Sequence, residues 1–251
     1  MKMNTITLSK EKIYSGNLLL VNAQYPLKNR CTDHLVTSDN HYPEILMKRI
    51  AVNFLQLILE KISAGSSIVI VSGYRSFEEQ TAIFEGSLKE NGEEFTRKYV
   101  ALPGHSEHQT GLAVDLALNQ GNIDFICPEF PYDGICNQFR KIASDYGFIQ
   151  RYTKDKEQIT GISNEPWHFR YVGYPHSKIM EESSLSLEEY MEFIKNYRED
   201  CRFVYQRGAE EGIAVYYVPF IHEGTKIFMP QDAVYQISGN NADGFIVTVW
   251  G

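Results

Sequence analysis

One segment, Ser106-Glu-His-Gln-Thr-Gly-Leu-Ala-Val-Asp115, constrains the fold more than any other part of the chain. Small Gly111 and Ala113 alternate with apolar residues and lead to Asp115, a period-two pattern that predicts a strand with the acid on one face. His108 lies seven residues before Asp115, and an odd offset puts two side chains on opposite faces of a continuous strand. We therefore expect Gly111 to break the register, so that His108 and Asp115 can face one site.

A second segment, Glu165-Pro-Trp-His168, completes the residue types of a metal site. Pro166 favours extended geometry for the residue before it, and a bend there would turn Glu165 and His168 towards the same place. A catalytic zinc needs three protein ligands, an open position for water and a nearby base. The set of His108, Asp115 and His168, with Glu165 close to the last ligand, matches these needs.

Composition and charge limit the class of protein. The chain has 251 residues, of which 43% are hydrophobic and 22% charged, a globular balance that predicts one or two domains. Its net charge of -8 argues against nucleic acid and favours small molecules or peptides as partners. The apolar runs are far shorter than the ~20 residues of a membrane span, and the start shows no export signal. We therefore expect a soluble, cytoplasmic protein with free cysteine thiols.

Hydrophobic periodicity predicts the elements that surround these motifs. We expect a loop from Pro26 to Pro43, helices over 44–62, 138–146 and 187–197, and strands over 17–22, 68–71, 111–116, 148–152 and 167–172. Ser76 is a candidate cap for a further helix that starts at Phe77 and ends near Gly92. Arg75 would then lie in a turn between a strand and this helix.

The region after the metal motifs has a different pattern. Aromatic and β-branched segments, divided by glycine-containing turns, occupy 214–221, 226–229 and 245–250. We therefore expect two domains, 1–199 with the metal motifs and 200–251 as a small β-rich extension, with Tyr216 and Tyr217 in its core. Residues 120–137, between the two motifs, are irregular in composition and follow the Asp115 strand, which makes them a candidate specificity loop.

Together, Ser106-x-His108-x-x-Gly111-x-Ala113-x-Asp115, the later Glu165-Pro-Trp-His168 and the upstream Ser72-Gly-Tyr-Arg75 resemble the zinc D,D-peptidases of vancomycin resistance. The likeness extends over roughly residues 17–197 and points to the bifunctional VanXY type, which combines D-Ala-D-Ala dipeptidase and D,D-carboxypeptidase activities. This resemblance implies an α+β fold with a central antiparallel sheet flanked by helices. It also implies a substrate that is D-Ala-D-Ala or a peptidoglycan precursor ending in D-Ala.

The resemblance also implies roles for individual residues. His108, Asp115 and His168 would hold one zinc ion, Glu165 would be the general base, and Arg75 would stabilise the oxyanion. Weaker candidates for binding the substrate's carboxylate or amide are Ser106, Tyr74 and Gln80. His105 departs from the family pattern and adds an imidazole beside the site, whereas the histidines expected to be structural or on the surface are His34, His41, His176 and His222.

Alternatives to these roles stay open. Glu165 could orient a metal ligand without acting as a base, and Arg75 could be a structural ion-pair partner. The same zinc site would also serve an L,D- or other metallocarboxypeptidase. A non-catalytic, zinc-containing binding module of the same fold is the more distant alternative.

Overall fold

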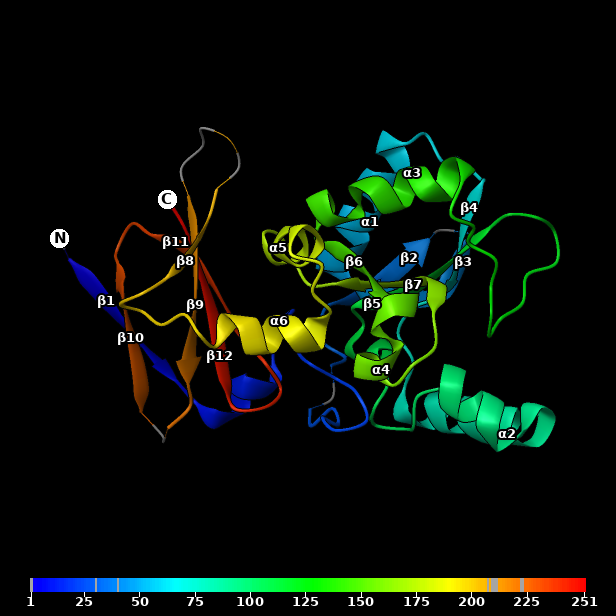
Figure 1. Cartoon of the computed structure of the whole chain (residues 1–251), viewed down its shortest axis with the longest axis horizontal. Helices are drawn as coiled ribbons and strands as arrows, with labels where there is room; N and C mark the ends of the chain where they lie inside the picture. Colours follow the sequence, from blue (N-terminus) through cyan, green and yellow to red (C-terminus); the bar gives the residue numbers. More distant parts are fainter. Residues whose placement is uncertain (1, 30, 40, 207, 209–211, 222–223) are drawn as a thin grey trace. The chain divides into compact units, whose positions relative to one another are not determined.

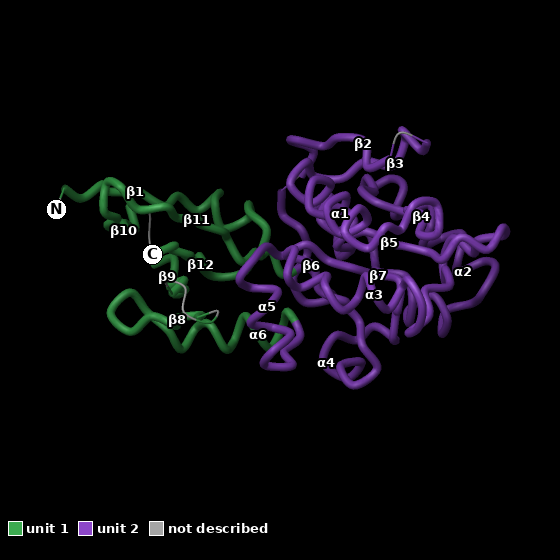
Figure 2. The backbone as a smooth tube through the Cα atoms, turned by 90° about the horizontal axis from the view of Figure 1, so that it is seen from above, with its two compact units in different colours: residues 1–20, 187–251 green, residues 21–186 purple. Residues whose placement is uncertain are grey.

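The computed structural model describes residues 2–29, 31–39, 41–206, 208, 212–221 and 224–251. The chain forms two compact units, coloured separately in Figure 2. We call residues 21–186 the motif unit, and residues 1–20 with 187–251, which include both chain ends, the terminal unit. This grouping places residues 1–20 with the C-terminal strands, whereas the expected boundary lay between residues 199 and 200. The expected division between residues 199 and 200 into two independently folding domains remains a prediction.

An antiparallel four-stranded sheet lies at the centre of the motif unit, in the order β4-β5-β7-β6 (Figure 1). Residues alternate between its faces, so that Val114 and Phe169 enter the hydrophobic core while Asp115 and His168 point to the other side. The expected α+β fold with a central antiparallel sheet is confirmed. The strands are β4 (Ile68–Ser72), β5 (Ala113–Leu118), β6 (Phe148–Tyr152) and β7 (Glu165–Tyr171).

Helices flank this sheet, with α1 and α3 on one side and α2 and α4 on the other in Figure 1. The apolar faces of α1 and α3 bury Leu55, Ile58 and Phe139 in the same core as the sheet residues. The bounds of the helices are α1 (Arg49–Lys61), α3 (Gly134–Ala143), α4 (Glu157–Thr160) and α5 (His176–Glu182), with short 3-10 turns η3 (Ser144–Tyr146) and η4 (Lys154–Lys156).

Helix α2 (Phe77–Tyr99) begins at the expected cap. Ser76 Oγ accepts the amide of Glu79, and the Glu79 side chain accepts the amide of Ser76, which makes a capping box. Gly92 has a non-helical conformation with φ 81°, at the point where the helix was expected to end. The chain then resumes a helix up to Tyr99, so the predicted end marks a kink.

Two expected elements are wrong. Residues 44–48, predicted as the first turn of a helix, belong to β3 (Tyr42–Lys48), which pairs with β2 (Leu35–Asp39) inside the expected loop. The apolar residues of this short segment fit either structure, and pairing across the hairpin favours the strand.

The strand expected over residues 17–22 is also wrong. The run Leu18–Leu20 is buried but is not a strand, because the amide of Leu18 donates to Ser238 Oγ and that of Leu20 to the Asn240 carbonyl.

The terminal unit is rich in strands, as expected for residues 200–251. Strand β1 (Met3–Leu8), which the sequence analysis missed, pairs with β10 (Thr225–Pro230). Tyr216 and Tyr217 are buried, in agreement with the expected core role. A second sheet has the order β11-β12-β9-β8, made of β11 (Val234–Gly239), β12 (Gly244–Trp250), β9 (Ile213–Pro219) and β8 (Phe203–Tyr205), and the unit also contains η1 (Lys10–Tyr14) and α6 (Leu187–Ile194).

All four cysteines are free, as the sequence predicted. Within the described ranges, none of the helices combines the length and the apolar character that a membrane crossing requires.

Candidate active site

The predicted break at Gly111 brings His108 to Asp115. Residues Glu107–Thr110 form a 3-10 turn, η2, and Gly111 follows in the left-handed region with φ 71° before β5 begins. The positive φ favours glycine here, and a Cβ atom at Gly111 would also lie 2.8 Å from Leu35 Cδ2, the end of a side chain that would have to move. His108 Nε2 consequently lies 3.1 Å from Asp115 Oδ2.

His168 reaches the same place from β7. It is the cross-strand partner of Asp115, and its Nδ1 lies 2.9 Å from Asp115 Oδ1. The pairing of β6 with β7 shifts between Gln150↔Phe169 and Tyr152↔Glu165, so that four residue steps on β7 match two on β6. Pro166 lies in this bulge, where its missing amide hydrogen disrupts no ladder bond. Glu165 Oε2 thereby comes within 3.7 Å of His168 Nδ1, which confirms the expected bend.

The three expected metal ligands form a compact, buried cluster. One ligand atom each from His108, Asp115 and His168 lies within 4.8 Å of the others. Two imidazole nitrogens and one carboxylate oxygen are a donor set that suits zinc. His108 Nδ1 lies 2.6 Å from the Gly73 carbonyl oxygen, to which it donates in the neutral tautomer with Nε2 free to face Asp115. The residues present therefore fit a zinc ion.

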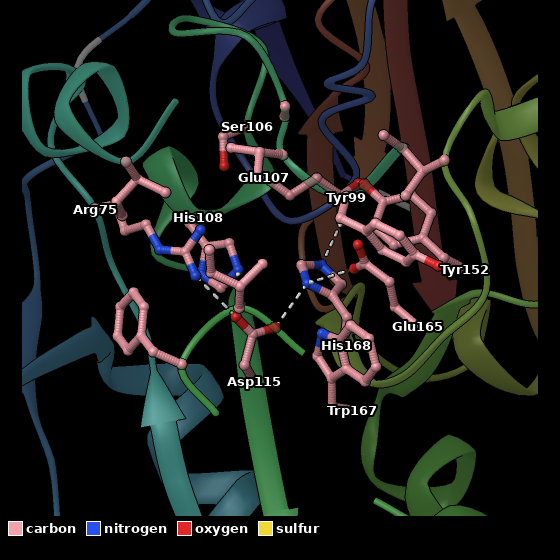
Figure 3. A pocket seen from close by; sticks show the side chains of 16 residues that line it. Arg75, Tyr99, Ser106, Glu107, His108, Asp115, Tyr152, Glu165, Trp167 and His168 are labelled. Atoms are coloured by element: carbon pink, nitrogen blue, oxygen red, sulfur yellow. Dashed lines mark hydrogen bonds and ion pairs between the residues drawn. The ribbon is translucent and has the colours of Figure 1, made fainter. Parts of the chain in front are cut away.

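A small cavity opens onto the cluster, and Figure 3 shows Asp115 between Arg75 and His168. Arg75 Nη2 donates to Asp115 Oδ2 at 2.9 Å, and Arg75 Nε donates to Ser72 Oγ at 2.9 Å. The predicted turn between β4 and α2 thus carries Arg75 to the cavity. Other residues that line it are Ser106, Glu107, Phe125, Tyr152, Glu165 and Trp167.

The three candidate substrate-binding residues differ in their placement. Ser106 lines the cavity, whereas neither Tyr74 nor Gln80 is among its described lining residues. Gln80 is fully buried, and its Nε2 donates to the carbonyl of Ala101, which does line the cavity. The amide of Tyr74 donates to the Leu46 carbonyl. Substrate binding by these residues stays a prediction, and Ser106 is the best placed.

The remaining histidines lie outside the metal cluster. His105 Nδ1 lies 2.7 Å from the Asn22 carbonyl oxygen, and the side chain lines a neighbouring cavity with Val100 and Tyr152. The departure from the family pattern therefore adds no fourth ligand. His34 and His41 are exposed, His176 is buried, and His222 falls outside the described residues.

The cluster shifts the pKa values of its members in opposite directions. Burial raises the pKa of Glu165 to about 8. Burial and the charge of Arg75 lower the pKa of His108 to about 4. Burial would also lower the pKa of His168, but hydrogen bonds to Asp115 and Glu107 outweigh it and raise this pKa to about 9. Titratable groups with such divergent pKa values in one cavity are typical of functional sites.

The sequence analysis missed Glu107, which lies between two residues of the motif. Its Oε1 accepts a hydrogen bond from Arg151 Nε at 2.8 Å and lies 3.1 Å from Arg170 Nη1. These two cations outweigh the effect of burial and hold the pKa of Glu107 well below its usual range. A signal was present in the sequence, because Arg151 and Arg170 lie in the predicted strands 148–152 and 167–172, and an arginine that becomes buried in a sheet needs an acid as partner.

The candidate specificity loop also reaches the cavity. Phe125 and Ile126 contribute to its lining, and the Phe125 ring centroid lies 5.8 Å from Arg75 Cζ. A loop in this position can contact whatever occupies the cavity, so its role in specificity stays a prediction.

Comparisons with known proteins agree with this geometry. The family model VanY, D-alanyl-D-alanine carboxypeptidase, matches residues 43–174. The vancomycin resistance D,D-dipeptidase VanXYg, solved with a D-Ala-D-Ala phosphinate analogue, is 64% identical over all of both chains, with a TM-score of 0.98. VanXYC of Enterococcus gallinarum, a bifunctional D-Ala-D-Ala dipeptidase and carboxypeptidase, is 42% identical over 71% of this chain and 95% of that protein.

A structure from a different peptidase class is also similar. The LD-carboxypeptidase LdcB is 34% identical over 69% of this chain and 84% of its own, with a TM-score of 0.58. The expected resemblance to VanXY-type peptidases is confirmed, and so is the expectation that the protein is an enzyme. The chain belongs to the VanY family of D-alanyl-D-alanine carboxypeptidases.

Proposed function

We propose that the protein is a zinc-dependent D,D-peptidase that hydrolyses the bond between two D-alanines and thereby contributes to glycopeptide resistance. Its substrate would be free D-Ala-D-Ala, the end of a peptidoglycan precursor, or both. The observation that carries the proposal is the convergence of His108, Asp115 and His168 in a cavity that Glu165 and Arg75 also line. The likeness to VanXYg and VanXYC supports the choice of substrate.

The zinc ion would be held by the two imidazoles and the carboxylate. Zinc in such a site supplies Lewis acidity, which lowers the pKa of a water molecule and polarises a carbonyl group. Asp115 contributes the negative charge of the site, because its pKa is well below its usual range despite burial. The pKa of about 4 keeps His108 neutral and able to ligate at neutral pH.

Glu165 is placed to move a proton during the reaction. With a pKa of about 8, both its ionised and its protonated forms are accessible near neutral pH, and a cation beside it would favour the ionised form. It would take a proton from water as the water oxygen bonds to the carbonyl carbon. It would then give this proton to the amine of the terminal D-alanine as the carbon–nitrogen bond breaks.

Arg75 would stabilise the oxyanion that forms when water adds to the carbonyl. Its guanidinium is always charged and carries five donors in a fixed fork. Two of its nitrogens bond to Ser72 and Asp115, so the group is held rigidly at the cavity wall with donors left for a substrate oxygen. A donor fixed before the reaction stabilises developing charge without reorganisation.

An assay of D-alanine release, combined with metal analysis, tests the proposal. The zinc-loaded protein is expected to hydrolyse D-Ala-D-Ala, a pentapeptide ending in D-Ala-D-Ala, or both. Glu165→Ala is expected to retain zinc and lose hydrolysis. Retained zinc without hydrolysis of any peptide by the unaltered protein would contradict the proposal and favour the non-catalytic module.

An L,D-carboxypeptidase is the second candidate, because the LD-carboxypeptidase LdcB is 34% identical over 69% of this chain. The same assay with a peptide in which an L-residue precedes the terminal D-alanine distinguishes the two. The higher identity to VanXYg over the whole chain favours the D,D-activity. Release from the L,D-peptide alone would reverse this preference.

A further inference from the structure

A cluster of three buried charges lies beside the candidate metal ligands. The side chains of Glu107, Arg151 and Arg170 are all 0% exposed. Oxygen Oε1 of Glu107 accepts from Arg151 and faces Arg170, at 2.8 and 3.1 Å. Burying three charges carries a desolvation cost even when they are paired, and an apolar cluster of the same volume is often as stable. Stability alone therefore gives no reason for a charged cluster, as opposed to an apolar one, at this place.

The other carboxylate oxygen of Glu107 points towards His168. Its Oε2 lies 3.5 Å from His168 Nε2, and neither atom has a closer hydrogen-bond partner among the described residues. The opposite ring nitrogen, Nδ1, faces Asp115 Oδ1 at 2.9 Å. The imidazole of His168 thus has a carboxylate at each nitrogen, Glu107 at Nε2 and Asp115 at Nδ1, with Glu165 farther from Nδ1 at 3.7 Å; Figure 3 marks these contacts by dashed lines.

We propose that Glu107 is a positioning residue that accepts the Nε2 proton of His168 and so directs the unprotonated Nδ1 to the metal. The inference rests on the proposed zinc centre. A neutral imidazole carries one N–H group, so an acceptor at Nε2 selects the tautomer with a lone pair at Nδ1. The two arginines hold the carboxylate fixed, because one of its oxygens is fully engaged with them.

The two histidines of the cluster are oriented by different means. For His108, the Gly73 carbonyl accepts from Nδ1 and leaves Nε2 for the metal, whereas for His168 a carboxylate is placed at Nε2. An anionic acceptor makes an imidazole a more basic ligand than a neutral acceptor does. His168 is therefore the stronger ligand of the pair, and its strength depends on Glu107.

Zinc affinity, measured by competition with a chelator, tests this role without relying on activity. Glu107→Asp retains the charge that pairs with Arg151 and Arg170 but withdraws the oxygen from His168 by one methylene. Glu107→Gln retains the length and removes the charge. Each variant is expected to bind zinc roughly 10- to 100-fold more weakly than the unaltered protein, the usual loss when such an orienting partner is changed.

Phe139→Leu is a matched control for a purely structural effect. Phe139 is buried in the core of the motif unit and lies outside the cavity, so its truncation lowers the melting temperature without touching His168. Zinc affinity is expected to be unchanged in this control. If Phe139→Leu lost as much zinc affinity as the Glu107 variants for a similar fall in melting temperature, the weaker binding would reflect lower stability and the positioning role would be wrong.

NMR of the unaltered protein gives a readout that does not require either variant to fold. With cadmium bound and histidine labelled with an NMR-active nitrogen isotope, coupling to the metal is expected at Nδ1 of His168, with a proton on Nε2. Coupling at Nε2 would overturn the inference, as would unchanged zinc affinity in both Glu107 variants. Absence of peptide hydrolysis by a protein that binds zinc in this way would contradict the proposed function but not the role of Glu107.

Discussion

Three groups surround the Asp115 carboxylate: Arg75 donates to it, and His108 Nε2 and His168 Nδ1 face it at 3.1 and 2.9 Å. Burial raises its pKa, but the two histidines outweigh this effect and hold the carboxylate in its ionised form. A metal ion held by Asp115 would share this carboxylate with the positive charge of Arg75, whose Nη2 lies 2.9 Å from Asp115 Oδ2. Removal of Arg75 should therefore change zinc binding and turnover in different ways.

Replacement of Arg75 by Met should leave zinc binding intact or tighter and reduce turnover. The variant removes a cation that shares Asp115 and also the donor proposed for the oxyanion. We expect kcat to fall by roughly 100- to 1000-fold, the usual loss for such a donor. Metal analysis and D-alanine release at saturating zinc measure the two effects, with Arg49→Met, an exposed position on α1, as the control. Normal turnover in Arg75→Met would show that the residue is only an ion-pair partner.

His168→Ala should lose zinc and activity together, because it removes one of three ligands. His105→Ala is the matched control, since this histidine contacts the Asn22 carbonyl and lies outside the cluster. We expect His105→Ala to retain a full equivalent of zinc, measured by atomic absorption after dialysis. Loss of zinc in the His105 variant would show that the ligand set is misassigned.

At the scale of single elements, local pattern predicted much of the site. The alternation before Asp115, the offset of His108 and the proline after Glu165 predicted a strand, a register break and a bend, and the structure contains all three. Strand β3 was missed because five residues of mixed pattern fit a helix or a strand, and only pairing with β2 decides. Glu107 was missed because its partners, Arg151 and Arg170, lie on strands remote in sequence.

Gly111→Ala should weaken zinc binding through the turn that carries His108. The left-handed conformation costs a residue with Cβ about 1–2 kcal/mol, and here the Cβ would also contact Leu35 Cδ2 at 2.8 Å. Gly161→Ala is a close control, because Gly161 has φ 73° and no atom within 4 Å of its would-be Cβ. Both variants should lose stability in thermal unfolding, but only Gly111→Ala should lose zinc affinity. Equal affinities would mean that the turn tolerates a Cβ without moving His108.

At the scale of the whole molecule, the class of fold could be predicted but the grouping of its parts could not. The sheet and its helices follow from patterns within 21–186, whereas β1 joins the C-terminal strands through pairing with β10. Pairing between the two ends of a chain depends on contacts that no local periodicity records.

Buried groups of the motif unit make its stability depend on pH in two directions. Glu165 and His168 have pKa values of about 8 and 9 in the folded state, against 4.5 and 6.5 as ordinary values. Between these values the folded protein holds a proton that the unfolded chain has lost. The contributions of both groups fall as pH rises, from 4.5 to 8 for Glu165 and from 6.5 to 9 for His168. His108 and His176, with pKa values of about 4 and 3, contribute stability that rises with pH up to 6.5.

The metal-free protein is therefore expected to be most stable near pH 6.5, where the two histidine contributions are complete and the loss from His168 begins. Each group whose protonation differs between the states contributes a slope of about 1.4 kcal/mol per pH unit. Glu165→Gln removes one such group, so its stability should fall less steeply than that of the unaltered protein between pH 6.5 and 8. Chemical unfolding in the presence of a chelator, at a series of pH values, measures both slopes. Parallel curves for the two proteins would show that Glu165 is already ionised in the folded, metal-free state, because a group with the same protonation in both states adds no slope.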